Sequence, residues 1–155
     1  MRADLTAVAS GSASAAALRR DGVIHFPKGL LGFPHVSQYR LAEGPGAGLY
    51  WLSGTDPGAP SFLLSDPFVY FQDLSLELTS THVDQIEAGD SSDVAVLAVT
   101  VPNRDTGTWT ANLQGPVVVN VAKGLGAQVI LPDQSLGVRR EFRPMAPQPR
   151  GANDR

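Results

Sequence analysis

Short apolar runs recur along the chain, many with alternating polar positions, and Gly, Pro, Asn or Asp separate most of them. Runs of this length with this punctuation are typical of β-strands joined by tight turns. Many short strands favour a mainly β fold, a small antiparallel β-barrel-like domain, because closing the sheet removes its exposed edges. The expected strands are Val23–Phe26, Tyr39–Ala42, Leu49–Ser53, Ser61–Ser65, Leu74–Thr79, Val94–Val101, Thr108–Leu113, Val117–Ala122, Gln128–Leu131 and Val138–Phe142.

Two polar segments predict turns, and one segment predicts a short helix. Residues 102–107 form a hairpin loop in this interpretation, and residues 123–126 form a turn before the strand that follows them. Thr81 and Asp84 fit a capping box, with Asp in place of the usual Glu. Apolar residues continue at helical spacing until Gly89, where the helix is expected to stop.

Composition divides the chain into one body and two ends. Residues 1–20 are rich in Ala and Ser, and residues 143–155 are rich in Pro with little to bury, so both ends are expected to be disordered. Residues 21–142 then form the single domain. The chain contains no cysteine and no apolar run long enough to span a membrane, and its N-terminus lacks a secretory signal pattern. A cytoplasmic protein without disulfides is expected.

The charges are distributed unevenly. Both ends together hold six arginines and two acidic residues, so residues 21–142 carry six basic and thirteen acidic groups, a net charge of −7. One interpretation is a solvated acidic surface that aids solubility, and the other is a docking face for a basic partner. Nucleic acid is disfavoured as a direct ligand of the body in either case, because phosphate contacts need cationic groups. The carboxylates of greatest interest are Asp84, Glu87, Asp90 and Asp93.

Candidate catalytic and metal-binding groups form no pattern. The three histidines, His25, His35 and His82, have no metal-ligand spacing, and the glycine-rich segment 44–48 has neither a following helix nor a suitably placed lysine. No nucleophile elbow or catalytic triad signature is visible. An enzyme, a metal site and a cofactor are therefore not expected.

Two other groups of residues have alternative interpretations. Phe68 and Tyr70 would lie on one side of an extended segment and Phe71 on the other, so that part of this set fills the core and the rest forms an apolar patch with an acidic border. Asn112 and Asn120 have side chains that need hydrogen bonds within an apolar, strand-rich region. Each is expected to hold a neighbouring loop by its backbone, with direct contact to a partner as the alternative.

Two segments about eighty residues apart are the most informative parts of the chain. In the first, residues 24–34, Pro27 fixes its own φ, and Gly29 and Gly32 permit backbone conformations that other residues avoid, which predicts a rigid turn rimmed by aromatic residues such as Phe33. The second covers residues 112–120, where Pro116 precedes a run of valines, and is followed by the short segment 128–131. These segments suggest recognition by shape, because they contain no group of catalytic character.

At these residues the chain resembles the FliW family of flagellar assembly factors, which carries F-P-x-G-L-x-G-F, N-L-x-x-P-I-V-I-N and Q-V-I-L elements in this order. The resemblance covers residues 21–142 and implies a β-barrel-like fold and a switch between partners without catalysis. FliW-like proteins bind cytoplasmic flagellin near its C-terminal helical region and separately bind CsrA, a translational regulator that binds RNA. When flagellin is exported, the released factor engages CsrA, which then lets go of the flagellin messenger.

The resemblance and the residue patterns together give a set of expected sites. An acidic body would steer association with CsrA, because an RNA-binding partner is basic. The alternative function is a small β-barrel enzyme or ligand-binding protein with a pocket inside the barrel. A deep polar cavity would favour that alternative, and a filled barrel with an apolar outer patch would favour the partner switch. Residues expected to contact partners are Phe33, Phe68, Tyr70, Asp84, Glu87, Asp90 and Asp93, and residues expected to be structural are Gly29, Gly32, Asn112, Pro116 and Asn120.

Overall fold

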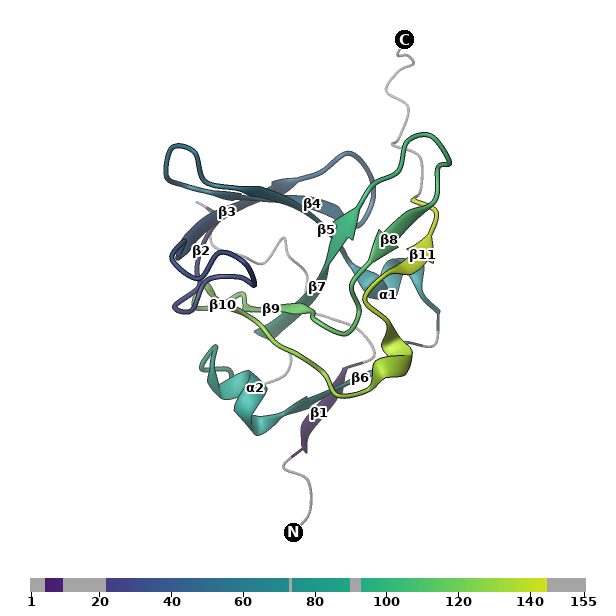
Figure 1. The fold of residues 1–155 in the computed structure, drawn as a ribbon. Helices are drawn as coiled ribbons and strands as arrows, with labels where there is room; N and C mark the ends of the chain where they lie inside the picture. The colour runs from purple at the N-terminus through teal and green to yellow at the C-terminus, as the bar shows by residue number, and fades with distance from the viewer. Residues whose placement is uncertain (1–4, 10–21, 73, 90–92, 145–155) are drawn as a thin grey trace.

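The computed structural model describes residues 5–9, 22–72, 74–89 and 93–144 of the chain. Strands dominate these residues, and the helices are short (Figure 1). The strands are β1 (Leu5–Ala9), β2 (Val23–His25), β3 (Gln38–Glu43), β4 (Leu49–Gly54), β5 (Ser61–Ser65), β6 (Leu76–Thr79), β7 (Val94–Val101), β8 (Trp109–Ala111), β9 (Val117–Asn120), β10 (Leu125–Gln128) and β11 (Arg140–Phe142). The helices are α1 (Pro67–Tyr70), α2 (Ser80–Asp84) and a 3-10 turn, Gln134–Leu136.

Seven strands close into a barrel, which confirms the predicted fold class. Their order is β7-β5-β4-β3-β2-β10-β9, and a pairing between β9 and β7 closes the ring. Neighbouring strands are antiparallel, with one exception that the sequence patterns did not indicate. Strand β10 runs parallel to β2 through the pair Leu125 and His25. A parallel pairing is possible here because a long connection, rather than a tight hairpin, joins the two strands. Beyond β7, the sheet continues outside the ring through β8 to β11.

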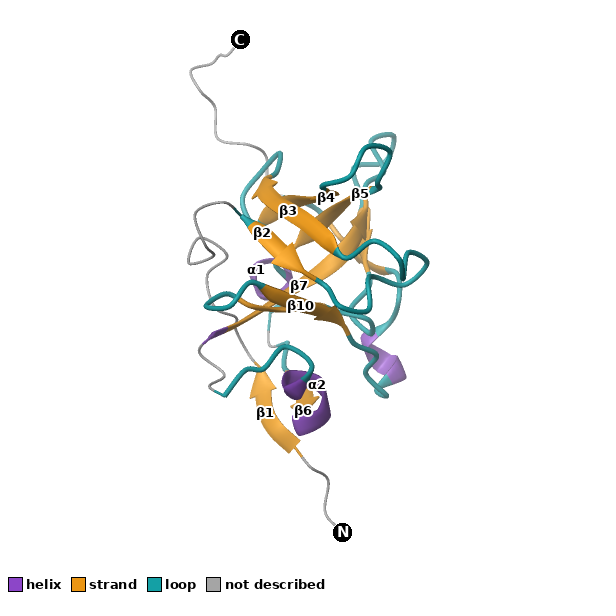
Figure 2. Ribbon diagram, turned by 90° about the vertical axis from the view of Figure 1, so that its left-hand side faces the viewer, coloured by secondary structure: helices purple, strands orange, loops and turns teal. Residues whose placement is uncertain are grey.

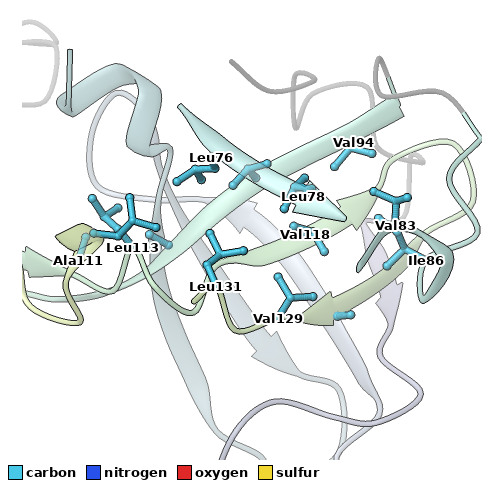
Figure 3. Packing of buried hydrophobic residues seen from close by; sticks show 14 of the residues in the cluster. Leu76, Leu78, Val83, Ile86, Val94, Ala111, Leu113, Val118, Val129 and Leu131 are labelled. Carbon is cyan, nitrogen blue, oxygen red and sulfur yellow. The ribbon is translucent and has the colours of Figure 1, made fainter. Parts of the chain in front are cut away.

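The protein has two apolar cores, one on each face of the strands β7 and β9. The inner core fills the barrel, and the outer core lies between the barrel wall and the segments that cover it. Figure 3 shows many of the outer-core side chains. Buried residues of the inner core are Ile24, Phe26, Leu30, Tyr39, Leu52, Leu64, Ala95, Leu97, Val117, Val119 and Val121. Buried residues of the outer core include Leu76, Leu78, Val83, Ile86, Val94, Val96, Ala98, Leu113, Val118, Val129 and Leu131.

The composition of β7 explains why this strand separates the two cores. Successive side chains of a strand point to opposite faces, so Ala95 and Leu97 face the inner core while Val94 and Val96 face the outer core. A strand with both faces buried needs apolar residues at every position. The continuous apolar run of residues 94–99 in β7 therefore fits its position between two layers.

One side of the barrel is covered by β1, β6 and α2, which lie together below it in Figures 1 and 2. Strand β1 pairs antiparallel with β6, with Ala7 opposite Leu78 and Ala9 opposite Leu76. The segment 1–20 was expected to be disordered, and that expectation is wrong for Leu5–Ala9, because pairing with β6 orders this strand. Residues 1–4, 10–21 and 145–155 lie outside the described residues, and with them most of the two predicted disordered ends.

The helices differ from the prediction in number and in position. Helix α2 starts earlier than expected: Thr79, not Thr81, is its N-cap, and the capping box pairs Thr79 with His82. Residues 67–70 are helical rather than extended, because the Asp66 side chain accepts a hydrogen bond from the amide of Phe68 and Pro67 occupies the first turn. An Asp-Pro pair is a helix-start signal, and it was present in the sequence.

Some strand boundaries also shift. The predicted turn at residues 123–126 is shorter than expected, because β10 already begins at Leu125 and pairs with β9 through Gln128. The predicted strand at residues 128–131 therefore lies mostly beyond β10. Within the described part of the chain, no helix has the length and apolar character that a membrane crossing requires.

Candidate functional site

The first informative segment forms two consecutive tight turns between β2 and β3. The amide of Gly29 donates to the carbonyl of Phe26 at 2.9 Å, and the amide of Phe33 donates to the carbonyl of Leu30 at 2.8 Å. Gly29 and Gly32 both have positive φ values, of 66° and 88°. A side chain at Gly29 would also collide with the backbone of Phe33 and Pro34, whereas the space around Gly32 is open. Gly29 is therefore the more demanding of the two positions.

The second informative segment is held by its own asparagine. The Asn112 side-chain oxygen accepts hydrogen bonds from the amides of Gln114 at 3.1 Å and Gly115 at 2.9 Å. Pro116 is buried, and its carbonyl accepts from the amide of Val129 at 3.0 Å. Asn112 thus holds a loop by its backbone, as the first of its two interpretations proposed.

Gln128 joins the two informative segments to each other. Its side-chain oxygen accepts from the amide of Leu31 at 3.0 Å, and its side-chain nitrogen donates to the carbonyl of Gly115 at 2.9 Å. One side chain therefore bridges residues that are more than eighty positions apart in sequence. This bridge holds the Leu31 turn against β10 and leaves the Leu31 side chain outside, with 59% of its surface exposed.

A pocket with a volume of about 510 Å³ opens beside this turn, between the turn, β10 and Gln85, the C-cap of α2. We call it the Leu31 pocket. Its walls are mostly apolar, with the amides of Gln85 and Gln128 and the ammonium group of Lys28 as the polar groups. The lining residues are Pro27, Lys28, Gly29, Leu30, Leu31, Gly32, Pro34, Gln85, Gly126, Ala127 and Gln128.

Ile130 extends the apolar surface beside the Leu31 pocket. Val129 and Leu131 are buried in the outer core, so Gln128 and Ile130 face the opposite side of this extended segment. The Ile130 side chain is 56% exposed. Leu31 lines the pocket and Ile130 follows two residues after the lining residue Gln128, and exposed apolar side chains near an apolar pocket are typical of a surface that binds another protein.

The far wall of the Leu31 pocket depends on α2, and His82 fixes this helix. The amide of Thr79 donates to Nδ1 of His82 at 3.1 Å, and the imidazole also hydrogen-bonds the backbone of Ile130. Burial lowers the pKa of His82 below 6.5, and the bond to Ile130 opposes that shift. A neutral imidazole is needed here, because Nδ1 accepts a hydrogen bond from Thr79.

Asn120 holds the other end of α2 and is almost fully buried. Its side-chain nitrogen donates to the carbonyls of Ile86 at 3.0 Å and Glu87 at 3.3 Å, and its oxygen accepts from the amides of Ala122 and Lys123. Glu87 is the one non-glycine residue of the described chain with a positive φ, 55°. Asn120 therefore ties a strained turn after α2 to the connection between β9 and β10.

The acidic residues are arranged differently from the prediction. Helix α2 ends at Asp84, so Asp84 and Glu87 do not share a helical face. Glu87 is also compensated, because Lys123 Nζ lies 3.1 Å from its carboxylate and both side chains are exposed. Asp84 is exposed and Asp93 is half-buried beside β7, while Asp90 lies outside the described residues. The acidic segment (Asp84, Glu87 and Asp93) thus borders α2 without forming the uncompensated cluster that was expected.

The aromatic residues pack inward to a greater extent than predicted. Phe33 is half-buried and lies edge-to-face against Phe62, with ring centroids 5.6 Å apart, and it does not line the Leu31 pocket. Phe68 and Tyr70 sit on α1 and pack against the outer core, where the ring of Tyr70 lies 4.7 Å from that of Phe142. The extended conformation expected for this segment is therefore wrong, whereas the expected packing of part of this set against the core is found, and contact with a partner stays a prediction.

Apolar side chains of the inner core occupy the interior of the barrel. Large side chains such as Phe26, Tyr39 and Leu52 are fully buried there. The Tyr39 hydroxyl is buried without a hydrogen-bond partner, and burial raises the pKa of this phenol. Among the described residues, no three His, Cys, Asp or Glu side chains are grouped as metal ligands. The surface of the molecule, rather than its interior, therefore offers the candidate site.

Sequence reasoning found the segments that form the Leu31 pocket but not the residues that shape it. Leu31, Gln85, Gln128 and Ile130 were not singled out as site residues. Leu31 could have been noticed, because a large apolar residue between two turn glycines has few ways to be buried. No sequence pattern indicated Gln85 as a site residue, since its place in the pocket wall depends on how α2 packs against β10.

Comparisons with known proteins agree with one another. A family model described as "FliW protein" matches residues 9–142. The chain is 34% identical over 116 residues to a protein of Natranaerobius thermophilus named "Flagellar assembly factor FliW", covering 74% of this chain and 77% of the relative. It is also 34% identical over 125 residues to a protein of the same name from Geobacillus sp. strain WCH70, covering 79% and 85%. A solved structure titled "Crystal structure of the flagellar assembly factor FliW" superimposes with a TM-score of 0.73 at 28% identity, covering 83% of this chain and 90% of the solved chain.

Proposed function

The chain belongs to the FliW family of flagellar assembly factors, and from this we propose that it acts without catalysis as a switch between two protein partners. It binds flagellin in the cytoplasm and acts toward it as a chaperone. When flagellin is exported, the released factor binds and antagonises the translational regulator CsrA. Flagellin synthesis is thereby coupled to flagellin export.

The Leu31 pocket is the observation that supports this proposal best. Three sequence elements typical of the family meet at it through Gln128, which suggests that they are arranged for a common purpose. The described residues that line it contribute no carboxylate, imidazole or thiol, and Lys28 is the only ionisable residue among them. A partner would therefore be recognised by shape and apolar contact. We assign the Leu31 pocket to flagellin.

The acidic segment is the second contact surface in this proposal. Residues 21–142 carry a net charge of −7, and CsrA is expected to be basic because it binds RNA. Complementary charge raises the rate of association more than it raises affinity. Asp84 is exposed and forms no ion pair among the described residues, so it is better placed than Glu87 to meet a cationic partner.

Helix α2 connects the two surfaces. Gln85 lines the Leu31 pocket, and Asp84, its neighbour in the chain, belongs to the acidic segment. A partner that moves α2 at one surface would change the other surface. Either this coupling or direct overlap of the two sites would make the partners exclude each other. If the sites are coupled, a coupling free energy of about 1–3 kcal/mol between the two binding events is enough for the switch.

The alternative, a small β-barrel enzyme or ligand-binding protein with an internal pocket, has less support. Apolar side chains fill the interior of the barrel, and the relatives are named as assembly factors. The Leu31 pocket has a volume within the range of small-molecule sites, about 300–1,000 Å³. Its open position between a turn, a strand and a helix suits a protein partner better.

The test is to measure binding of purified full-length protein to flagellin and to CsrA by calorimetry, singly and in competition. The variant Leu31→Glu places a charge at the mouth of the pocket and is expected to weaken flagellin binding by about a hundredfold, or ~2–3 kcal/mol, as for a central contact residue. CsrA binding should change much less. Val101→Glu is the matched control, because Val101 is equally exposed and lies outside the pocket.

Two results would contradict the proposal. One is that neither flagellin nor CsrA binds the wild-type protein, which would reject the switch altogether. The other is that Leu31→Glu and Val101→Glu have the same effect on flagellin binding, which would reject the Leu31 pocket as the flagellin site. Circular dichroism and thermal melting of each variant would show that a loss of binding is not a loss of folding.

A further inference from the structure

Strand β11 is the last strand of the nine-stranded sheet, and among the described residues one of its edges is free. It pairs with β8 on one side, with Glu141 opposite Thr110. Within the described residues, no backbone hydrogen bond reaches the other edge of β11. Edge strands of this kind are where an extended polypeptide can add to a sheet by main-chain hydrogen bonds. The ring closure that protects the other strands does not extend to β11.

Side chains on one face of β11 hold the strand against the outer core. Phe142 is buried against the rings of Phe71 and Trp109, and the guanidinium group of Arg140 lies 5.6 Å from the Phe71 ring centroid. Arg140 also donates to the carbonyl of Leu136 at 3.2 Å. These contacts anchor the strand on the outer core. The strand can therefore keep its position when its edge is paired.

The residues that flank β11 are basic and lack ion pairs. Arg139 and Arg143 stand immediately before and after the strand, and both are exposed. Among the described residues, the one ion pair is between Lys123 and Glu87, so neither arginine is neutralised. The Arg143 guanidinium lies close to Gly107, in the loop that also carries the exposed Arg104. In a body of net negative charge, this concentration of cations is the exception.

We propose that β11 is a docking edge for an acidic, extended segment of another protein, which adds to it as a further strand. The free edge supplies main-chain hydrogen bonds, and Arg139 and Arg143 supply charge complementarity for the side chains. This surface is separate from the Leu31 pocket and from the acidic segment. The inference goes beyond the switch between flagellin and CsrA and does not require it.

The spacing of charges specifies the segment further. Arg139 and Arg143 are four residues apart, about 13 Å along an extended chain. The exposed Glu141 lies between them. An added strand should therefore carry acidic residues at positions i and i+4, with a basic residue at i+2 opposite Glu141. Such cross-strand pairs are the contacts that select among strands.

Nucleic acid fits this surface less well than a polypeptide does. A phosphate backbone cannot use the free amide and carbonyl groups of a strand edge in a regular ladder. The body also carries seven negative charges in excess, which opposes a polyanion at longer range. An acidic peptide can form the main-chain ladder, and with few charges it is repelled less by the negative body.

The experiment measures binding of labelled peptides to the full-length protein by fluorescence anisotropy. The probe contains Glu-Val-Lys-Val-Glu with neutral ends, and the comparison peptide contains Lys-Val-Glu-Val-Lys. The probe should bind with saturation at low salt, and the comparison peptide should bind about tenfold more weakly. Methylation of the probe's backbone nitrogens on alternate residues leaves its charge unchanged. One of the two methylated forms should lose binding, because only one edge of the added strand faces β11.

The variant Arg139→Gln/Arg143→Gln should weaken probe binding about tenfold. The matched control Gln38→Glu/Ala42→Glu makes the same change of net charge at exposed positions of β3 and should have little effect. Failure of the probe to saturate, equal effects of the two double variants, or retention of binding by both methylated forms would overturn the proposal. Tighter binding of a single-stranded RNA of equal length would also overturn it. Flagellin and CsrA binding, measured on the same preparation, would show whether the proposed switch stands independently.

Discussion

The inner and outer cores share the strands β7 and β9 but are enclosed in different ways. The inner core is surrounded by a closed ring of seven paired strands. The outer core is bounded on one side by that ring and on the other by β6, α2 and α1, which are short and have few backbone bonds to the barrel. The inner core cannot open unless several strand pairings break. The outer layer can loosen while the barrel persists.

This difference places the candidate function in the less constrained layer. The Leu31 pocket has one wall on the barrel, at β10, and another on α2. A surface that must exchange partners benefits from one wall that holds its position and one that can move. We expect the barrel to be the fixed part and α2, which is attached through His82 and Asn120, to be the adjustable part.

The largest expected effect comes from removing a ring from the inner core. Phe26→Ala should lower the free energy of unfolding by about 3–5 kcal/mol, because Phe26 is fully buried and packs edge-to-face on Tyr39. Ile86→Ala in the outer core should cost about 2–4 kcal/mol. Urea denaturation measures both values. If Ile86→Ala were the more destabilising variant, the inner core would not be the more strongly held region.

The second effect concerns the attachment of α2. Asn120→Ala leaves two carbonyls and two amides without their partner and should cost about 1–3 kcal/mol. Hydrogen exchange should accelerate in residues 80–88 more than in β3 and β4. Asn112→Ala is the comparison, since its bonds stay within one loop and it does not touch α2. Uniform acceleration over the whole barrel would show that the outer layer does not open separately.

A third, smaller effect is a pH dependence confined to the outer layer. The folded-state pKa of His82 is lowered below 6.5, so the unfolded chain binds more protons in this range and stability rises with pH. The contribution of His82 is complete above about pH 6.5 and is lost as the pH falls through the folded-state pKa. Protonation also removes the acceptor for the amide of Thr79.

Thermal melting between pH 7.5 and 5 would show this loss, and His82→Gln should reduce it. Glutamine at this position can still accept the capping hydrogen bond but does not titrate. An unchanged pH profile in His82→Gln would assign the dependence to other groups. If His82 is responsible, hydrogen exchange at pH 5.5 should be accelerated at α2 relative to the barrel strands.

The smallest expected effect comes from a substitution in the inner core that should not destabilise the protein. The Tyr39 hydroxyl is buried without a partner, so Tyr39→Phe removes an unsatisfied group and keeps the ring. The variant should be neutral or stabilising by up to about 1 kcal/mol. A loss of stability above that size, measured by urea denaturation, would show that the hydroxyl has a bonding role in the barrel.

Much of the barrel was predictable because its strands carry local signals. Alternating or continuous apolar residues between turn residues located β3, β4, β5, β7 and β9 to within a few positions. That β7 is buried on both faces was not predicted, although its long apolar run is typical of such a strand. The capping residue of α2 was missed by two positions, because Thr79 and Thr81 are both acceptable caps and the choice depends on where β6 ends.

The site was less predictable, since its parts come together only through tertiary contacts. The segments around Gly29, Asn112 and Pro116 were identified, and the glycines have the positive φ values that the turn requires. Phe33 packs on Phe62 and Tyr70 packs on Phe142, so both rings are half-buried, and their contact with a partner stays a prediction. The exposed positions are instead aliphatic, at Leu31 and Ile130.

By itself, the sequence determined the properties that depend on near neighbours in the chain. These are the approximate extent of most strands, the turns that need glycine or proline, the acidic balance and the family elements. Tertiary structure alone decided how distant segments meet: the parallel pairing of β10 with β2, the ordering of β1 by β6, and the bridge from Gln128 to Leu31 and Gly115. The physical reason is that hydrogen bonding and burial across a fold depend on which surfaces come into contact. A glutamine in a strand has no preferred distant partner until the barrel closes around it.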